Sequence, residues 1–248
     1  MRILFFAALF LSFIQLQAQE RFSYAIPDLQ METTSVWQTI RDIKFFESHG
    51  YQVNLPKGKL IQDMIEKSKK GEFGSDDFSS LYQFMEDSVY RKSDYEKGIA
   101  NVKARISFLE ELVNDISQNN WSWGFETFDT YQINLTLYGS GGSYNPDNAS
   151  ILLFTNTEGG FKNYADPANT LIHEIVHLGI EASLIQKYQV PHAMKERVVD
   201  TIVFYYFGES LPDYRRQDMG DNRLDAYTKS KEDLARIDRA LTKILHEE

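Results

Sequence analysis

Apolar residues at helical spacing dominate the first half of the chain. Four stretches place them three or four positions apart and so predict helices, over residues 31–46, 60–70, 78–89 and 93–116. In the last stretch the steps from Ile99 to Ile116 are 3, 4, 3, 4 and 3. This stripe is too short for a coiled coil and predicts a helix packed on a sheet or on other helices. We therefore expect residues 19–118 to form a mostly helical N-terminal region.

The period changes to two after residue 120. Between Tyr131 and Tyr138 apolar residues alternate with mostly polar ones, which predicts a half-buried strand. The apolar run Ile151–Phe154 predicts a buried strand. The glycine-rich residues 139–143 between them predict a flexible turn. Helical spacing then returns, with a final amphipathic helix expected over residues 232–245.

The helix expected after Asp166 and Pro167 carries an H-E-x-x-H motif at His173, Glu174 and His177. Residues four apart lie on one helix face, so both imidazoles can bind one zinc ion. Glu174 lies beside that ion and can accept a proton from metal-bound water. Apolar residues around the rest of the helix predict that it is buried, where these polar groups are costly unless paired or metal-bound. The alternative is a buried helix with two structural histidines.

A catalytic zinc site needs a third protein ligand. The next helix is expected between Pro191 and Gly208, and it places Glu196 and Asp200 on one face. We predict that Glu196 binds the metal and that Asp200 holds a ligand histidine through its second ring nitrogen. The alternative is a solvated stripe of charged residues that form ordinary helix pairs.

Two other side chains compete for the third ligand position. Glu181 follows His177 by four residues, which moves it about 6 Å along the helix axis. We expect it to be structural, to support a ligand or to contact substrate. His192 would complete a three-histidine site, but it lies one turn before Glu196. Both rank behind Glu196.

The spacing of these residues resembles that of the gluzincin, or thermolysin-like, zinc metallopeptidases. The matching pattern is His173-Glu174-x-x-His177, a gap of about twenty residues, then Glu196-x-x-x-Asp200. The resemblance implies that His173, His177 and Glu196 bind Zn2+. It also implies that Glu174 activates the metal-bound water that hydrolyses a peptide bond, and that Asp200 supports a histidine.

The resemblance also implies a fold and an oxyanion-stabilising tyrosine. Residues 119–248 would form a zincin-like α+β catalytic region, in which a small antiparallel or mixed sheet packs on helices. The soft boundary near residue 118 also allows one domain. Tyr188, between the two site helices, would hydrogen-bond the oxyanion, although it could equally be a core residue. Other tyrosines could take this role instead, namely Tyr205, Tyr206 and Tyr214.

The sequence departs from the gluzincin pattern in two places. Lys195 replaces the asparagine common before the third ligand, and His246 is the only histidine that follows His192. These departures leave a second interpretation open, an exported zinc-binding interaction module with a vestigial peptidase site. A third interpretation is an exported helical scaffold in which the motif is accidental.

The chain begins with a pattern typical of export. Residues 1–18 contain one arginine, an apolar run and a small-residue end, which predicts a signal peptide cleaved after Ala18. No membrane span is expected after cleavage. The chain has no cysteine, hence no disulfide, and the combination fits a bacterial periplasmic or extracellular protein.

The charge of the chain restricts its partners. A formal net charge of −10 disfavours nucleic acid and anionic membrane surfaces as partners. It weakly favours neutral or basic substrates. We expect a peptide or protein substrate, and the sequence does not predict an oligomeric state.

Overall fold

The computed structural model describes residues 20–217 and 220–246. The predicted signal peptide lies outside these residues. Helices predominate around a small mixed sheet of four strands, which confirms the predicted α+β class and the mixed sheet.

The sheet has the strand order β1-β2-β4-β3. Its strands are β1 (Phe22–Ala25), β2 (Tyr131–Thr136), β3 (Ser143–Asn145) and β4 (Ser150–Phe154). Strands β1, β2 and β4 are parallel, while β3 pairs antiparallel with β4 and forms one edge. β2 is almost entirely buried because it lies between two neighbours. The edge strand β3 was not predicted, and it directly follows the glycine-rich turn.

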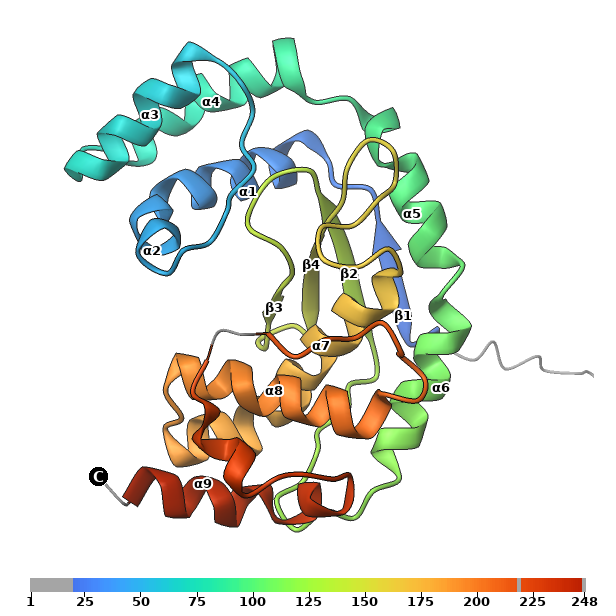
Figure 1. The fold of residues 1–248 in the computed structure, drawn as a ribbon. Coiled ribbons are helices and arrows are strands. Elements are labelled where there is room, and N and C mark those ends of the chain that lie inside the picture. The colour runs from blue at the N-terminus through green and yellow to red at the C-terminus, as the bar shows by residue number, and fades with distance from the viewer. Residues whose placement is uncertain (1–19, 218–219, 247–248) are drawn as a thin grey trace, which may run out of the picture.

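The first helices form a lobe with its own apolar core. They are α1 (Leu29–Arg41), α2 (Ile43–Ser48), α3 (Lys59–Lys70) and α4 (Phe78–Phe84). Val36 and Ile40 of α1 pack there against Ile61 and Leu81. Figure 1 shows this lobe above the sheet. The helix expected over residues 31–46 is divided at Asp42.

The rest of the predicted N-terminal region belongs to the larger core. β1 pairs with β2, and helices α5 (Glu96–Lys103) and α6 (Ile106–Ser117) flank the sheet (Figure 1). Their buried residues share one apolar cluster with the sheet and the later helices. The single helix expected over residues 93–116 is therefore two helices. At the break between them, Arg105 forms an ion pair with Asp166.

Three later helices complete the molecule: α7 (Pro167–Ile180), α8 (His192–Phe207) and α9 (Ile237–His246). α7 packs against β3, β4 and α8, and all its residues are buried. A π-helical turn, Glu181–Gln186, follows it. None of the helices in the described ranges has the length and apolar content needed to cross a bilayer.

Candidate metal centre

The start of α7 is fixed as the sequence predicts. The Asp166 carboxylate accepts a hydrogen bond from the backbone N–H of Ala168 at 3.0 Å, and Pro167 is the first helical residue. Because the helix is buried all round, His173 and His177 are only 8% and 2% exposed. The predicted buried helix with two histidines on one face is therefore present.

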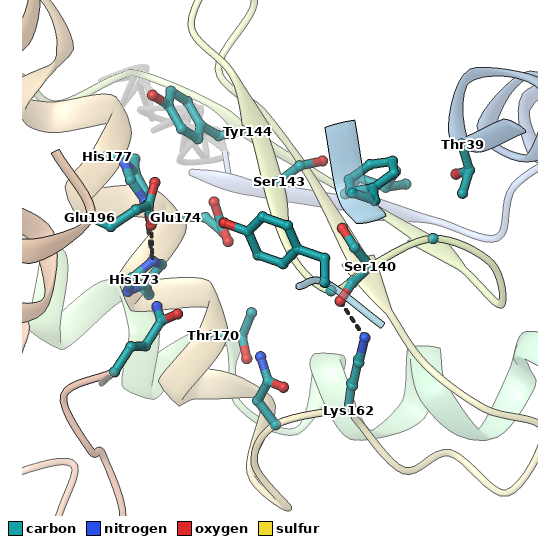
Figure 2. Close-up of a pocket in the computed structure, with 18 of the residues that line it drawn as sticks. Thr39, Ser140, Ser143, Tyr144, Lys162, Thr170, His173, Glu174, His177 and Glu196 are labelled. Carbon is teal, nitrogen blue, oxygen red and sulfur yellow. Dashed lines mark hydrogen bonds and ion pairs between the residues drawn. The ribbon is translucent and has the colours of Figure 1, made fainter. Parts of the chain in front are cut away.

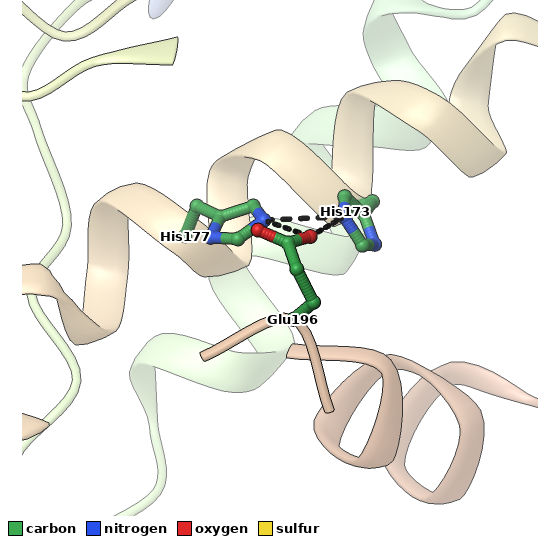
Figure 3. A group of neighbouring side chains, drawn as sticks. All are labelled: His173, His177 and Glu196. Carbon is green, nitrogen blue, oxygen red and sulfur yellow. Dashed lines mark hydrogen bonds and ion pairs between the residues drawn. The ribbon is translucent and has the colours of Figure 1, made fainter. Parts of the chain in front are cut away.

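The carboxylate of Glu196 on α8 meets both imidazoles (Figure 3). His173 Nε2 and His177 Nε2 are 3.2 Å apart. Glu196 Oε2 lies 3.6 Å from His173 Nε2 and 3.3 Å from His177 Nε2. Tetrahedral zinc, with ligands at about 2.0–2.2 Å, separates neighbouring ligand atoms by about 3.3–3.6 Å. The three atoms thus have the spacing of one triangular face of a zinc tetrahedron.

A tyrosine holds the other side of His173. The Tyr214 hydroxyl donates to Asp200 Oδ1 at 2.6 Å and lies 2.6 Å from His173 Nδ1. Because its single proton is donated to Asp200, the hydroxyl accepts from Nδ1–H of the histidine. In the neutral form of the ring, this tautomer leaves Nε2 unprotonated on the side of His177 and Glu196. Asp200 therefore supports His173 mainly through Tyr214, since the direct distance from Nδ1 to its carboxylate is 3.5 Å.

Packing holds His177. Its ring stacks on Tyr144 of β3, with centroids 4.6 Å apart and an interplanar angle of 12°. The Tyr144 hydroxyl donates to Glu181 at 2.8 Å and lies 3.1 Å from Lys195 Nζ. Glu181 therefore has a supporting role and is not among the ligand atoms. No hydrogen-bond partner of His177 Nδ1 lies within the described part of the chain.

Glu174 lies beside the three candidate ligands but is not one of them. Its carboxylate borders Gly142, where an added Cβ would be 2.3 Å from Oε1. Burial raises the pKa of Glu174 to about 7, and the charge of Lys195 opposes this rise. A carboxylate with a pKa near neutrality can accept and return a proton, which is the property that a general base requires.

The ligand side chains have charge states suited to a cation. Burial lowers the pKa of His177 to about 4, so this ring is neutral near pH 7. Burial opposes ionisation of Glu196, but its contacts with the two histidines outweigh burial and hold its pKa below the ordinary value. Burial likewise lowers the pKa of His173, but the neighbouring Glu196, Glu174 and Asp200 outweigh it and raise this pKa above 6.5. One neutral imidazole, one carboxylate and one imidazole that must lose its proton therefore face one point.

The group opens into a cavity of about 780 Å3. One wall comes from α1, α2 and the segment up to Tyr51, and another from the glycine-rich loop and β3. The remaining walls come from α7, the first turns of α8, and the segments around Lys162 and Tyr214. Figure 2 shows Glu174 and the ligand side chains directed into this space.

The structure does not bring every predicted residue to the cavity. Tyr188 packs against the core beside Lys187 and is not a lining residue, so the oxyanion role predicted for it has no geometric support. His192 lies at the mouth, with Nδ1 3.7 Å from the other oxygen of Glu196, Oε1. Among the alternative tyrosines, only Tyr214 lines the cavity.

Comparison with protein-family models, with curated proteins and with solved structures finds no match for this chain. The functional argument therefore rests on the site itself.

Proposed function

We propose that the protein is a zinc-dependent peptidase. The observation that carries this proposal is the convergence of His173, His177 and Glu196 at zinc-like spacing, with Glu174 buried beside them at the end of a large open cavity. Two imidazoles and a carboxylate are a ligand set of catalytic zinc sites, which keep a further position open. The signal-peptide pattern adds the proposal that this peptidase acts after export.

Zinc fits the residues present, and His173, His177 and Glu196 would hold it. Two imidazole nitrogens at 3.2 Å with a carboxylate beside both are the donor set that a divalent cation stabilises. Bound there, zinc supplies a Lewis acid and lowers the pKa of water toward 7. Tyr214 and Asp200 fix the tautomer and orientation of His173 for this role.

The other groups of the cavity supply proton transfer and binding. Glu174 takes a proton from the attacking water and passes it to the leaving amine. The ammonium of Lys195 contacts Tyr144 beside His177, and it is the cation best placed to stabilise the oxyanion in place of Tyr188. The edge strand β3 lines the cavity and can pair with an extended peptide.

The test compares wild type with Glu174→Gln after zinc loading. We expect wild type to cleave members of a peptide library, and the variant to bind one zinc per chain but cleave about 10²- to 10⁴-fold more slowly. Glu111→Gln on the exposed face of α6 is the matched control and should keep full activity.

Two other results have clear meanings. Zinc bound at one equivalent with no cleavage of any peptide supports the non-hydrolytic binding module. Cleavage by Glu174→Gln at the wild-type rate would contradict the proposed role of Glu174 in proton transfer.

A further inference from the structure

The cavity wall is more positive than the chain as a whole. Lys162, Lys195 and Arg215 line it, and no acidic side chain of the described residues forms an ion pair with any of them. Of the acids that line the wall, Asp42 pairs with Arg41, Glu196 belongs to the candidate metal centre, and Glu174 lies beside that centre against Gly142. Cations outnumber acids on this concave wall, and a concave surface concentrates their field, so the cavity attracts anions although the protein as a whole carries −10.

Among the cations that line the cavity, Lys162 is held in place by neutral groups and has no acidic partner among the described residues. Its ammonium donates to the carbonyl oxygen of Ser140 at 2.5 Å and to that of Gln52. Both acceptors are neutral, and partial burial lowers the pKa of this lysine. Lys195 differs, because the Tyr144 hydroxyl that it contacts donates to an acid, Glu181. A carboxylate that reached Lys162 would form a charge-assisted hydrogen bond, which is stronger than a bond to a neutral acceptor.

The glycine-rich loop sets the distance from Lys162 to the reacting centre. Ser140 holds Lys162, and Gly142 lies against Glu174. Two residues of extended chain span at most about 7 Å. Figure 2 shows Lys162 at the Ser140 end of this loop, on the side away from Tyr144 and His177. A substrate peptide that runs along this loop would place one residue beside Lys162. That residue would lie within about two positions of the peptide bond that is cleaved beside Glu174.

We propose that the cleft selects peptides with a carboxylate within two residues of the cleaved bond, and that Lys162 binds this carboxylate. The inference rests on the proposed peptidase function and specifies its substrate class. The carboxylate comes from an acidic side chain or from the C-terminus of a short peptide, since both present the same group. Lys195 and Arg215 add to the attraction for anions but do not contact the bound carboxylate.

The test starts from a peptide that the zinc-loaded protein cleaves. One pair of peptides carries Glu or Gln two residues from the cleaved bond and tests an acidic side chain. A second pair ends at that position in a free carboxylate or an amide and tests the C-terminus. We expect kcat/KM to be at least tenfold higher for one of the carboxylate versions than for its neutral partner. The same peptides are titrated into zinc-loaded Glu174→Gln protein by calorimetry, where the carboxylate version should bind at least tenfold more tightly.

Variants of Lys162 connect this preference to the residue. Lys162→Gln should bring the ratio of kcat/KM between the carboxylate and neutral peptides close to one. Lys162→Arg should retain the wild-type ratio. The ratio cancels any general loss caused by breaking the contacts of Lys162 with the two carbonyl groups. Lys59→Gln, exposed and outside the cavity, should leave the ratio at the wild-type value.

The outcomes separate this proposal from the peptidase proposal. Glu174-dependent cleavage without preference for a carboxylate overturns the role of Lys162 and leaves the peptidase in place. A preference that persists in Lys162→Gln also overturns it. No cleavage of any peptide, together with no difference in binding between carboxylate and neutral versions, overturns both.

Discussion

His173 and His177 are held in place by different forces. His173 is oriented by a hydrogen-bond chain through Tyr214 to Asp200, whereas His177 is held by its stack on Tyr144. Loss of one hydroxyl can therefore disturb the first ring without moving the second.

Tyr214→Phe removes the hydroxyl that links His173 to Asp200. We expect zinc affinity to fall about 10- to 100-fold, because supporting hydrogen bonds of this kind contribute that much to metal sites. Competition with a chromophoric chelator measures the change. Tyr188→Phe is the matched control, since Tyr188 lies outside the cavity, and it should bind zinc as wild type does. Equal affinity in wild type and Tyr214→Phe would show that the hydrogen-bond chain has no influence on the metal.

Zinc affinity should depend on pH through His173. Its pKa is raised above 6.5, so below that pH zinc must displace a proton, while His177 and Glu196 are already unprotonated. Affinity should therefore rise about tenfold per unit between pH 5.5 and 6.5 and level off above the pKa of His173. Calorimetry on the wild-type protein measures it, because Glu174 is one of the charges that raise the pKa of His173. Zinc affinity that does not change between pH 5.5 and 6.5 would contradict the raised pKa of His173.

The ligands could be predicted from the sequence, but their support could not. Helix geometry places His173 and His177 on one face, whereas Glu196 was predicted from the need for a third ligand and from the gluzincin spacing. Tyr214 lies 41 residues from His173 in a segment without helical or strand period, so no spacing rule predicts their contact. The same limit explains why Tyr188, which is close to the motif in sequence, was favoured over Tyr214.

At the scale of elements, the glycine-rich loop and β3 form one functional unit. The loop passes over Glu174 at Gly142, and β3 then supplies Tyr144 against His177. Gly142 is required for this approach, since a side chain there would occupy the place of the carboxylate.

Gly142→Ala should lower kcat/KM about a hundredfold, because its Cβ would lie 2.3 Å from Glu174 Oε1 and displace the carboxylate. The free energy of unfolding should fall by only about 1–3 kcal/mol, the usual cost of overpacking. Steady-state assays and urea unfolding measure the two effects. Gly74→Ala, where no atom lies within 4 Å of the added Cβ, is the control for both. Wild-type activity in Gly142→Ala would mean that the loop does not fix the position of Glu174.

Hydrophobic periodicity could not predict short strands or breaks within helices. β1 and β3 have four and three residues, too few to show a two-residue period. The breaks at Asp42 and Arg105 interrupt apolar stripes that continue across them, so periodicity gave no sign of either break. The helix ends that the chain signals were close to those observed: α7 begins at the expected Pro167, and α8 lies between the expected Pro191 and Gly208.

At the scale of the whole molecule, the candidate metal ligands connect α7 to α8 within the larger core, while the lobe of α1–α4 supplies one wall of the cavity. The lobe is attached by Glu32 of α1, which accepts the backbone N–H of Leu137 just after β2 at 2.9 Å. Metal binding should therefore stabilise the larger core directly.

Zinc should raise the melting temperature of the metal-free protein. A free concentration a hundredfold above Kd adds about 2.7 kcal/mol, which for a chain of this size corresponds to about 5–10 °C. Scanning calorimetry with and without zinc measures the shift. Glu196→Gln, which lacks the anionic ligand, should show a much smaller one. An equal shift in both proteins would place the stabilising zinc elsewhere.

The most direct test of the account is a crystal structure of zinc-soaked protein with anomalous data at the zinc edge. The account predicts one strong peak within about 2.0–2.2 Å of His173 Nε2, His177 Nε2 and a Glu196 oxygen, with a further position open to the cavity. No peak at this group, or a peak bound by other side chains, would contradict it.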